Sequence, residues 1–391
     1  MSVYLDHAAT TPLRPEVLDA MMPYLTDHYG NPSSIHGTGR RARQGLDEAR
    51  ERIAATLGAK PREIVFTGGG TEADNLAVKG AAWASSARGR KVVTTSIEHK
   101  AVLHSCAVLE RFGFGITYLP VDRYGRVDPA DVAAAIGEHT TLVSVMYANN
   151  EVGTVQRIAE IGGICRERRA LFHVDAVQAA GFLPLDVDAL QVDLLSLGAH
   201  KIHGPKGVGA LFVRQGTALL SQLSGGSQER QRRAGTENVA GIVGFARALE
   251  LAQADVAARE TENARLAALR EELVAGLTAM PGVTLTGHPF ERLPNNASFV
   301  IEGVEGGDLV AALDLEGIDT STGSACTTGS AEPSHVLLAM GIAPELAHGS
   351  LRLTAGRGTS REDVRHTIEA TRSVLQRMRG VGAPRAEVAS V

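Results

Sequence analysis

The sequence predicts an α/β protein with a mostly parallel central sheet flanked by helices, followed by a smaller α+β domain. Between about residues 60 and 250, short apolar runs alternate with Ala-rich helical stretches, the pattern of strands joined by helical crossovers. Several of these runs are β-branched and nearly continuous, as expected of strands buried on both faces. After Gly235 the alternation stops and longer helical stretches follow. This change marks the passage to the second domain.

The expected strands of the large sheet are the apolar runs Glu63–Thr67, Lys91–Thr95, Gly115–Pro120, Thr141–Tyr147, Leu171–Asp175, Val192–Leu197 and Val208–Val213. Residues 239–280 are rich in Ala, Leu, Glu and Arg and predict one or two long helices. In the smaller domain we expect strands near Val283–Thr286, Ala297–Glu302 and Ser350–Thr354. Its last helix should begin near Ser360, where Ser360 and Asp363 form a capping box. We therefore expect a large domain at 15–255 and a small domain made of 1–14 and 256–391.

Composition and charge exclude several classes of protein. The chain has 391 residues, 44% of them hydrophobic, which is enough for two cores, and its net charge of −5 argues against a nucleic-acid-binding protein. Its three cysteines form no CxxC pair, which argues against a disulfide framework and a cysteine-rich zinc site. The N-terminus does not resemble a signal peptide, and no apolar run is long enough to span a membrane. We expect a cytoplasmic protein with reduced thiols.

A predicted strand runs directly into Gly68-Gly69-Gly70-Thr71 and then into a helix. Backbone N–H groups at a helix N-terminus attract anions, glycines let a phosphate approach closely, and Thr71 adds a hydroxyl donor. The segment is not a GxGxxG fingerprint and lacks the lysine of a P-loop. A tight strand–helix turn without a ligand would explain it as well. The segment is thus a candidate phosphate cradle of unspecified type.

Two further strand ends carry polar residues. His173 and Asp175 alternate on one face of a strand that ends at the sheet edge where ligands bind in open α/β folds, although a solvated carboxylate would fit too. Lys201 follows a buried strand and precedes a turn rich in Gly and Pro. A lysine confined in such a pocket is favoured as the neutral amine, which is the form that makes a Schiff base. The alternative interpretation is that Lys201 is an ordinary surface lysine. His200 and His203 lack a nearby carboxylate or cysteine, so we predict no metal site.

Cys326 lies in a segment of small polar residues, 321–330, and this environment indicates an accessible, reactive thiol. Structural cysteines are usually buried among apolar side chains. Cys106 and Cys165 both lie in apolar helical patterns, and we expect both to be buried.

The phosphate cradle, Asp175 and Lys201, in this order, resemble a fold-type I pyridoxal-phosphate enzyme. The segment around Cys326 narrows the resemblance to the cysteine desulfurases of the iron–sulfur-cluster type (group I), in the class V aminotransferase family. The resemblance runs from Tyr4 to about Arg357. Its matching stretches are Tyr4–Pro12, Gly30–His36, Glu98–Val102, Asn149–Gly153, His203–Gly209, Arg233–Thr236 and Gly323–Cys326.

The resemblance implies that Lys201 holds pyridoxal 5'-phosphate as a Schiff base and that Asp175 pairs with its pyridine nitrogen, which makes the ring an electron sink. It also implies that His99 stacks on the ring and shuttles protons. By the same resemblance, Asn150 and Gln178 would hydrogen-bond the phenolic oxygen of the cofactor. Its phosphate would be bound by Gly70, Thr71 and His200. The resemblance also implies a homodimer, in which Thr236 of the neighbouring subunit reaches this phosphate.

For the substrate, L-cysteine, the resemblance implies that Arg352 clamps the carboxylate and that Asn31 helps to orient it. Cys326 would attack the substrate sulfur, giving L-alanine and a persulfide. A protein such as an iron–sulfur scaffold or a thiolation enzyme would accept the sulfur. The chain departs from the family at Gly198, where a serine that binds phosphate is common, and at Gly68-Gly69-Gly70, which replaces a common Ser-Gly-Ala.

Three alternatives remain open from the sequence. A selenocysteine lyase would use the same residues on another substrate. Another fold-type I aminotransferase or lyase would have no need of Cys326. A non-catalytic member of the fold would have no need of Lys201, Asp175 and His99.

Overall fold

The structure is a computed structural model of the chain and describes residues 2–323 and 332–381. Its largest element is a seven-stranded sheet in the order β2-β8-β7-β6-β5-β3-β4. Strands β4, β3, β5, β6 and β7 run parallel, and β8 is antiparallel to β2 and β7. The strands are β2 (Ile64–Thr67), β3 (Lys91–Thr95), β4 (Gly115–Leu119), β5 (Thr140–Ser144), β6 (Leu171–Asp175), β7 (Leu194–Gly198) and β8 (Gly209–Val213). The predicted α/β class with a mostly parallel sheet is confirmed.

Adjacent residues of the central strands belong to two different hydrophobic cores, one on each face of the sheet. Val92 and Leu142 pack into one core, whereas Val93 and Val143 pack into the other. This explains why the strands appear in the sequence as continuous apolar runs. The first face is covered by α3 (Gly70–Asn75), the π-helical turn Leu76–Gly80, α4 (Ala81–Ala84) and α5 (Lys100–Arg111). The second is covered by α1 (Pro15–Thr26), α2 (Gly37–Leu57), α6 (Pro129–Ala135), α7 (Ile158–Glu167) and α8 (Val239–Gln253).

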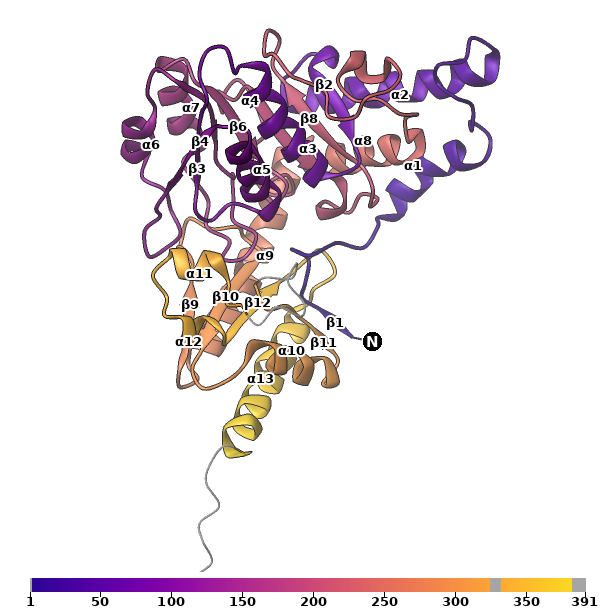
Figure 1. The fold of residues 1–391 in the computed structure, drawn as a ribbon. Coiled ribbons are helices and arrows are strands. Elements are labelled where there is room, and N and C mark those ends of the chain that lie inside the picture. The colour runs from indigo at the N-terminus through magenta and orange to yellow at the C-terminus, as the bar shows by residue number, and fades with distance from the viewer. Residues whose placement is uncertain (1, 324–331, 382–391) are drawn as a thin grey trace, which may run out of the picture.

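A three-stranded antiparallel sheet, in the order β12-β10-β9, lies below the large sheet in Figure 1, and α9 passes between the two regions. Its strands are β9 (Val283–Thr286), β10 (Asn296–Ile301) and β12 (Ser350–Thr354). The helices in this region are α9 (Val256–Thr278), α10 (Gly306–Leu315), α11 (His335–Ala339), α12 (Pro344–Ala347) and α13 (Arg361–Val381). Helices α9, α10 and α13 share a separate core with the sheet. The large sheet and the three-stranded sheet thus have separate cores.

The long helical stretch is resolved into two helices, because Asp255 caps the start of α9 by accepting from the N–H of Ala258 at 2.9 Å. The capping box at the start of α13 is also present: Ser360 N–H donates to Asp363, and Asp363 N–H donates back to Ser360. Two strands were not predicted, β1 (Val3–Tyr4) and β11 (Ile318–Asp319), which pair in parallel. Two residues are too few to show a period in the sequence.

The N-terminal segment links the two regions, since it leaves β1 beside the small sheet and reaches α1 beside the large one (Figure 1). No helix in 2–323 or 332–381 combines the length and the apolarity needed to cross a membrane. The segment after Val381 has Gly, Pro and Ala without periodicity, which predicts a frayed tail, and it lies outside the described part of the chain.

Candidate active site

A cavity of about 890 Å³ opens at the carboxyl edge of the large sheet, against the N-terminal segment and the small sheet. This is the edge at which ligands bind in open α/β folds. Nine of the residues proposed from the sequence line it: Gly70, Thr71, His99, Asn150, Asp175, Gln178, His200, Lys201 and Arg352. Cys326 lies outside the described residues, but Gly323, the last described residue before it, also lines the cavity.

The glycine segment forms one end of the cavity, where β2 passes into α3. Gly69 has a positive φ of 151°, and a Cβ on Gly70 would lie 2.7 Å from Cγ2 of Val177, so neither position accepts a side chain without strain. A Cβ on Gly198 would lie 3.5 Å from the backbone nitrogen of Gly70. The serine that the family often has at position 198 would therefore face this cradle, and Gly198 leaves it without that hydroxyl.

Lys201 sits on a 3₁₀ turn, Ala199–Lys201, directly after β7. Its Nζ donates to the carbonyl oxygens of Ala8 at 2.6 Å and Ala9 at 2.7 Å. These contacts hold the lysine side chain against the N-terminal segment. From the sequence, the N-terminal segment stands out only through its resemblance to the family. Its contacts with Lys201 join residues about 190 positions apart and leave no local pattern.

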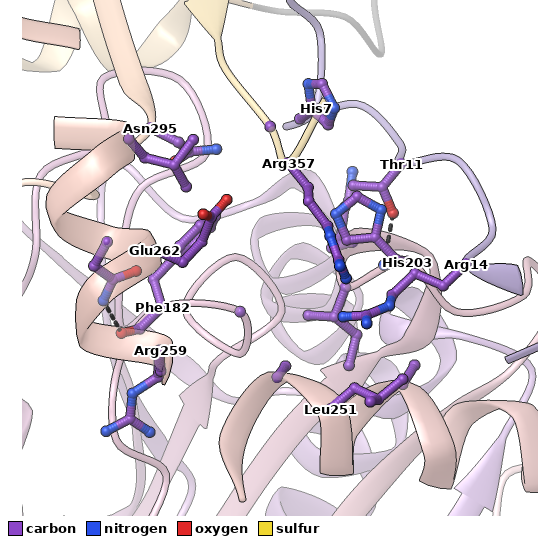
Figure 2. Close-up of a pocket in the computed structure, with 18 of the residues that line it drawn as sticks. His7, Thr11, Arg14, Phe182, His203, Leu251, Arg259, Glu262, Asn295 and Arg357 are labelled. Atoms are coloured by element: carbon purple, nitrogen blue, oxygen red, sulfur yellow. Dashed lines mark hydrogen bonds between the residues drawn. The ribbon is translucent and has the colours of Figure 1, made fainter. Parts of the chain in front are cut away.

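A smaller cavity of about 370 Å³ lies behind Lys201, and Lys201 and Gln178 line both cavities. Figure 2 shows Thr11 and His203 facing each other on the wall of this second cavity. Thr11 Oγ1 donates to the carbonyl of His200 at 2.9 Å and accepts from the N–H of His203 at 2.7 Å. These bonds fix the lysine turn on both sides of Lys201, including His203, whose φ is +63°.

Asp175 ends β6 and is only 6% exposed. It accepts from the N–H of Val177 at 2.9 Å. Burial raises the pKa of Asp175, while the nearby His99 and Lys201 act in the opposite direction. A buried carboxylate in this setting favours a cationic partner, and a protonated pyridine nitrogen is such a partner.

His99 is the N-cap of α5, and its Nδ1 accepts from the N–H of Ala101 at 3.1 Å. A neutral ring that accepts at Nδ1 carries its proton on Nε2. Nε2 is therefore the nitrogen of His99 that can exchange a proton within the cavity.

Arg352 on β12 is almost completely buried and is held by three oxygens. Nη1 donates to the carbonyls of Asn150 at 2.9 Å and Gly323 at 3.1 Å, and Nη2 donates to Oδ1 of Asp6 at 2.8 Å. Nε has no hydrogen-bond partner among the described residues. The three oxygens thus fix the guanidinium at the cavity wall, where a carboxylate clamp is expected. Asp6 was missed in the sequence because its partner is 346 residues away.

We expect Arg352→Lys to raise the KM for cysteine by about 10- to 100-fold, because an ammonium keeps the charge but loses charged hydrogen bonds worth about 1.5–3 kcal/mol each. Steady-state alanine formation measures this effect. The surface variant Arg365→Lys is the control and should leave KM unchanged. An unchanged KM in Arg352→Lys would rule out the predicted clamp.

Two predicted residues do not line the cavity of their own chain. Asn31 precedes α2 and uses its Oδ1 to accept from the N–H of Ser33 at 2.9 Å. Its role in orienting the substrate stays a prediction. Thr236 also lies outside the cavity wall, and its role across a dimer stays a prediction.

The other two cysteines are buried, as expected. Burial raises the pKa of both Cys106 and Cys165 to about 12, so neither is a thiolate at neutral pH.

Glu98, next to His99, is fully buried and accepts from Oγ1 of Thr95 at 2.6 Å and from the N–H of Met146 at 3.0 Å. Burial raises the pKa of Glu98 to about 8. Because the folded-state pKa lies above the unfolded value, the stabilisation is fully present at low pH and is lost as pH rises through about 8.

We expect Glu98→Gln to remove this loss. As the pH rises from 5 to 9, the free energy of unfolding of the unsubstituted protein should fall by up to about 4 kcal/mol relative to that of the variant. Urea unfolding at both pH values measures it, with the exposed Glu345→Gln as control. Equal pH dependence in Glu98→Gln and the unsubstituted protein would contradict the assignment.

The residues present fit pyridoxal phosphate. Asp175 supplies a buried carboxylate for the ring nitrogen, Lys201 an amine, and the glycine cradle room for a phosphate. Thr71, His200 and Lys206 line the same cavity and can donate to phosphate oxygens.

The comparisons with known proteins agree with this arrangement. The family model Aminotransferase class-V matches residues 3–366. A cysteine desulfurase IscS from Methanosarcina thermophila is 50% identical over 380 residues, covering 97% of this chain and 93% of its own. Among solved structures, a NifS-like protein matches with a TM-score of 0.90 and 38% identity, covering 96% of this chain and all of its own. A structure described as SspA in complex with cysteine matches with a TM-score of 0.80 and 36% identity over 90% of this chain and 98% of its own. The chain therefore belongs to the class V aminotransferase family and, within it, to the pyridoxal-phosphate-dependent cysteine desulfurases.

Proposed function

We propose that this protein removes sulfur from L-cysteine, releases L-alanine and receives the sulfur as a persulfide on Cys326. The observation that carries the proposal is the single cavity in which Lys201, Asp175, His99 and Arg352 meet. Identity of about 50% to cysteine desulfurases over nearly the whole chain supports the reaction, and the related structure in complex with cysteine supports the substrate.

Bound pyridoxal phosphate supplies an electron sink next to the substrate Cα. Arg352 binds the substrate carboxylate and orients the Cα–H bond. Lys201 Nζ takes the proton from Cα, and His99 Nε2 exchanges protons with the substrate as its charge changes. Asp175 keeps a negative charge at the ring nitrogen.

The sulfur leaves the substrate by attack of the Cys326 thiolate on the substrate sulfur. The S–S bond forms as the C–S bond breaks, and the carbon that loses sulfur takes up protons to give alanine. Cysteine and a protein thiol become alanine and a protein persulfide, so no external oxidant or reductant is needed.

The test is to incubate the holoenzyme with [35S]cysteine without reductant. We expect alanine and protein-bound label in equal amounts in the first turnover, with the label released by a thiol reductant. Alanine with unbound elemental sulfur and no protein-bound label would overturn the persulfide step, and no alanine at all would overturn the activity. The relative turnover of cysteine and selenocysteine distinguishes a cysteine desulfurase from a selenocysteine lyase.

A homodimer is the second part of the proposal. Large apolar side chains are exposed along α1 and the segment after it: Leu18, Met22, Leu25, Tyr29 and Ile35. Leu18, Met22 and Leu25 recur at helical spacing on α1, and an exposed apolar helix face is typical of an interface. A second copy of the chain would cover it and would bring Thr236 to the neighbouring cavity.

Mixing two inactive variants tests this arrangement. In a hybrid of Thr236→Val and Lys201→Ala chains, one of the two sites has both Lys201 and the partner chain's Thr236. We expect the mixture to regain activity that neither variant has alone, and light scattering to give twice the chain mass of 41.1 kDa. A monomer, or a mixture that stays inactive, would contradict the shared site.

The sulfur acceptor is proposed to be a protein, such as an iron–sulfur scaffold or a thiolation enzyme. The cytoplasmic location stays a prediction that rests on the cysteine content of the sequence.

A further inference from the structure

The segment 228–236, which ends at Thr236, contains a run of strained backbone. Glu229, Arg230 and Gln231 follow one another and have φ values of 47°, 58° and 65°. Residues other than glycine rarely adopt this left-handed conformation, because Cβ then lies too close to the following carbonyl oxygen. Such a conformation persists only where surrounding contacts impose it, and it is concentrated at functional sites. The contacts of this segment therefore indicate what it is built to hold.

The first anchor of the segment is a buried ion pair with α2. Arg50 on α2 donates from Nη2 to Oε1 of Glu229 at 2.6 Å and from Nη1 to Oε2 at 2.7 Å, and both side chains are almost completely buried. Oε2 of Glu229 also accepts from the N–H of Phe66 at 3.0 Å. Phe66 lies on β2, two residues before Gly68. Glu229 thus fixes the strained turn to the strand that leads into the glycine cradle of its own chain.

The second anchor joins the segment to the cradle itself. Arg233 donates from Nε to Oε1 of Glu72 at 2.8 Å and from Nη2 to Oε2 at 3.2 Å. Glu72 is in the first turn of α3 and lines the cofactor cavity, whereas Arg233 lies outside the cavity wall. Oε2 of Glu72 also accepts from the N–H of Gly68 at 2.7 Å. One carboxylate therefore holds the start of the cradle and the segment together, and the two charged hydrogen bonds from Arg233 fix their geometry.

Thr236 follows Arg233 by three residues and is exposed on its own chain. Between them, the N–H of Gly235 donates to Oε1 of Gln228 at 3.1 Å, which closes the segment on itself. The backbone that carries Thr236 is thus held in place while its side chain faces outwards. A donor fixed in this way before binding loses less conformational freedom when it meets a group outside its own chain.

We propose that Arg233 is a positioning residue for the cofactor phosphate of the neighbouring subunit. By its contact with Glu72 it ties segment 228–236 to the cradle of its own chain, and this sets the place at which Thr236 meets the phosphate of the other chain. The inference rests on the proposed homodimer and on the proposed role of Thr236. It adds a direction to them, since the loss of Arg233 in one subunit is felt in the cavity of its partner.

Hybrid dimers with one intact site test this direction, each chain being purified through its own affinity tag. One chain carries Lys201→Ala, so the cofactor absorbance band and the apparent Kd for pyridoxal phosphate report only the site of the other, unsubstituted chain. Arg233→Ala on the Lys201→Ala chain should weaken binding at the intact site by about tenfold or more, the effect of one lost hydrogen bond to a charged group. Thr236→Val on that chain should do the same.

Combined substitutions show whether the residues act as a unit. Arg233→Ala and Thr236→Val together on the Lys201→Ala chain should weaken binding no further than Thr236→Val alone, because Arg233 acts through Thr236. Glu72→Ala on that chain should reproduce the loss seen with Arg233→Ala, which assigns the effect to the pair. Arg232→Ala is the matched control and should leave the apparent Kd unchanged. Arg232 belongs to the same segment, and it donates to a backbone carbonyl, that of Arg62, at 3.2 Å.

The outcomes separate a failure of this inference from a failure of the proposed function. If Thr236→Val weakens binding at the intact site and Arg233→Ala does not, the inference is wrong and the shared site stands. A loss that occurs only when Arg233→Ala is on the chain with the intact Lys201 would mean that Arg233 serves its own cradle, and the inference would again be wrong. A monomer in light scattering, or a dimer that does not respond to Thr236→Val, would overturn the shared site together with the inference.

Discussion

Replacing Lys201 with alanine is expected to abolish cofactor-dependent absorbance near the visible edge and to lower alanine formation by about 10⁴-fold or more. The structure gives the reason, because Lys201 is the amine that the N-terminal segment holds in place through the carbonyls of Ala8 and Ala9. Without it, the protein loses both the covalent attachment of pyridoxal phosphate and the group that takes the Cα proton. Absorbance spectra and alanine release measure the two losses separately.

Lys206→Ala is the matched control, since Lys206 lines the same cavity. It removes one positive charge near the cradle but no covalent anchor. We expect the absorbance band to remain at saturating cofactor, with at most weaker cofactor binding. A band that survives in Lys201→Ala and disappears in Lys206→Ala would mean that the lysine was wrongly assigned.

The central sheet could be predicted from the sequence because its strands are buried on both faces. Residues such as Val92 and Val93 enter opposite cores, so every position in the run is apolar and the pattern is visible locally. The two-residue strands β1 and β11 lack such a pattern and were missed. Their pairing depends on the closeness of two segments more than 300 residues apart.

Residues at the ends of strands could be proposed for the same reason. Asp175 and Lys201 follow buried runs, and the carboxyl ends of parallel strands meet at one edge. The supporting contacts could not be foreseen. The Asp6–Arg352 ion pair and the Ala8 and Ala9 carbonyls on Lys201 join distant segments, and only the fold brings them together.

Asp74 shows a further limit of reading from the sequence. It lies just after the candidate phosphate cradle, yet its Oδ1 is 3.7 Å from Nε2 of His173, which lies between Ser144 and Ser196. The sequence shows His173 beside Asp175 but does not show that serines from both neighbouring strands flank it. The register of β5, β6 and β7 decides that contact.

Replacing Cys326 with alanine is expected to remove protein-bound sulfur entirely and to lower alanine formation about 10³-fold, because no nucleophile remains to take the substrate sulfur. Mass spectrometry after incubation with cysteine should find a mass increase of one sulfur atom on the unsubstituted chain and none on the variant. Released alanine gives the rate in the same samples.

Cys165→Ala is the matched control. Its thiol is buried and burial raises its pKa to about 12, so it supplies no thiolate at neutral pH. The substitution should lower stability by about 1–2 kcal/mol through the small cavity it leaves, while sulfur uptake stays unchanged. The contrast between the two cysteines isolates the chemistry of the thiol from its packing. If Cys326→Ala still forms alanine at the full rate and releases elemental sulfur, the substrate C–S bond breaks without a protein nucleophile, and the protein is a simple lyase.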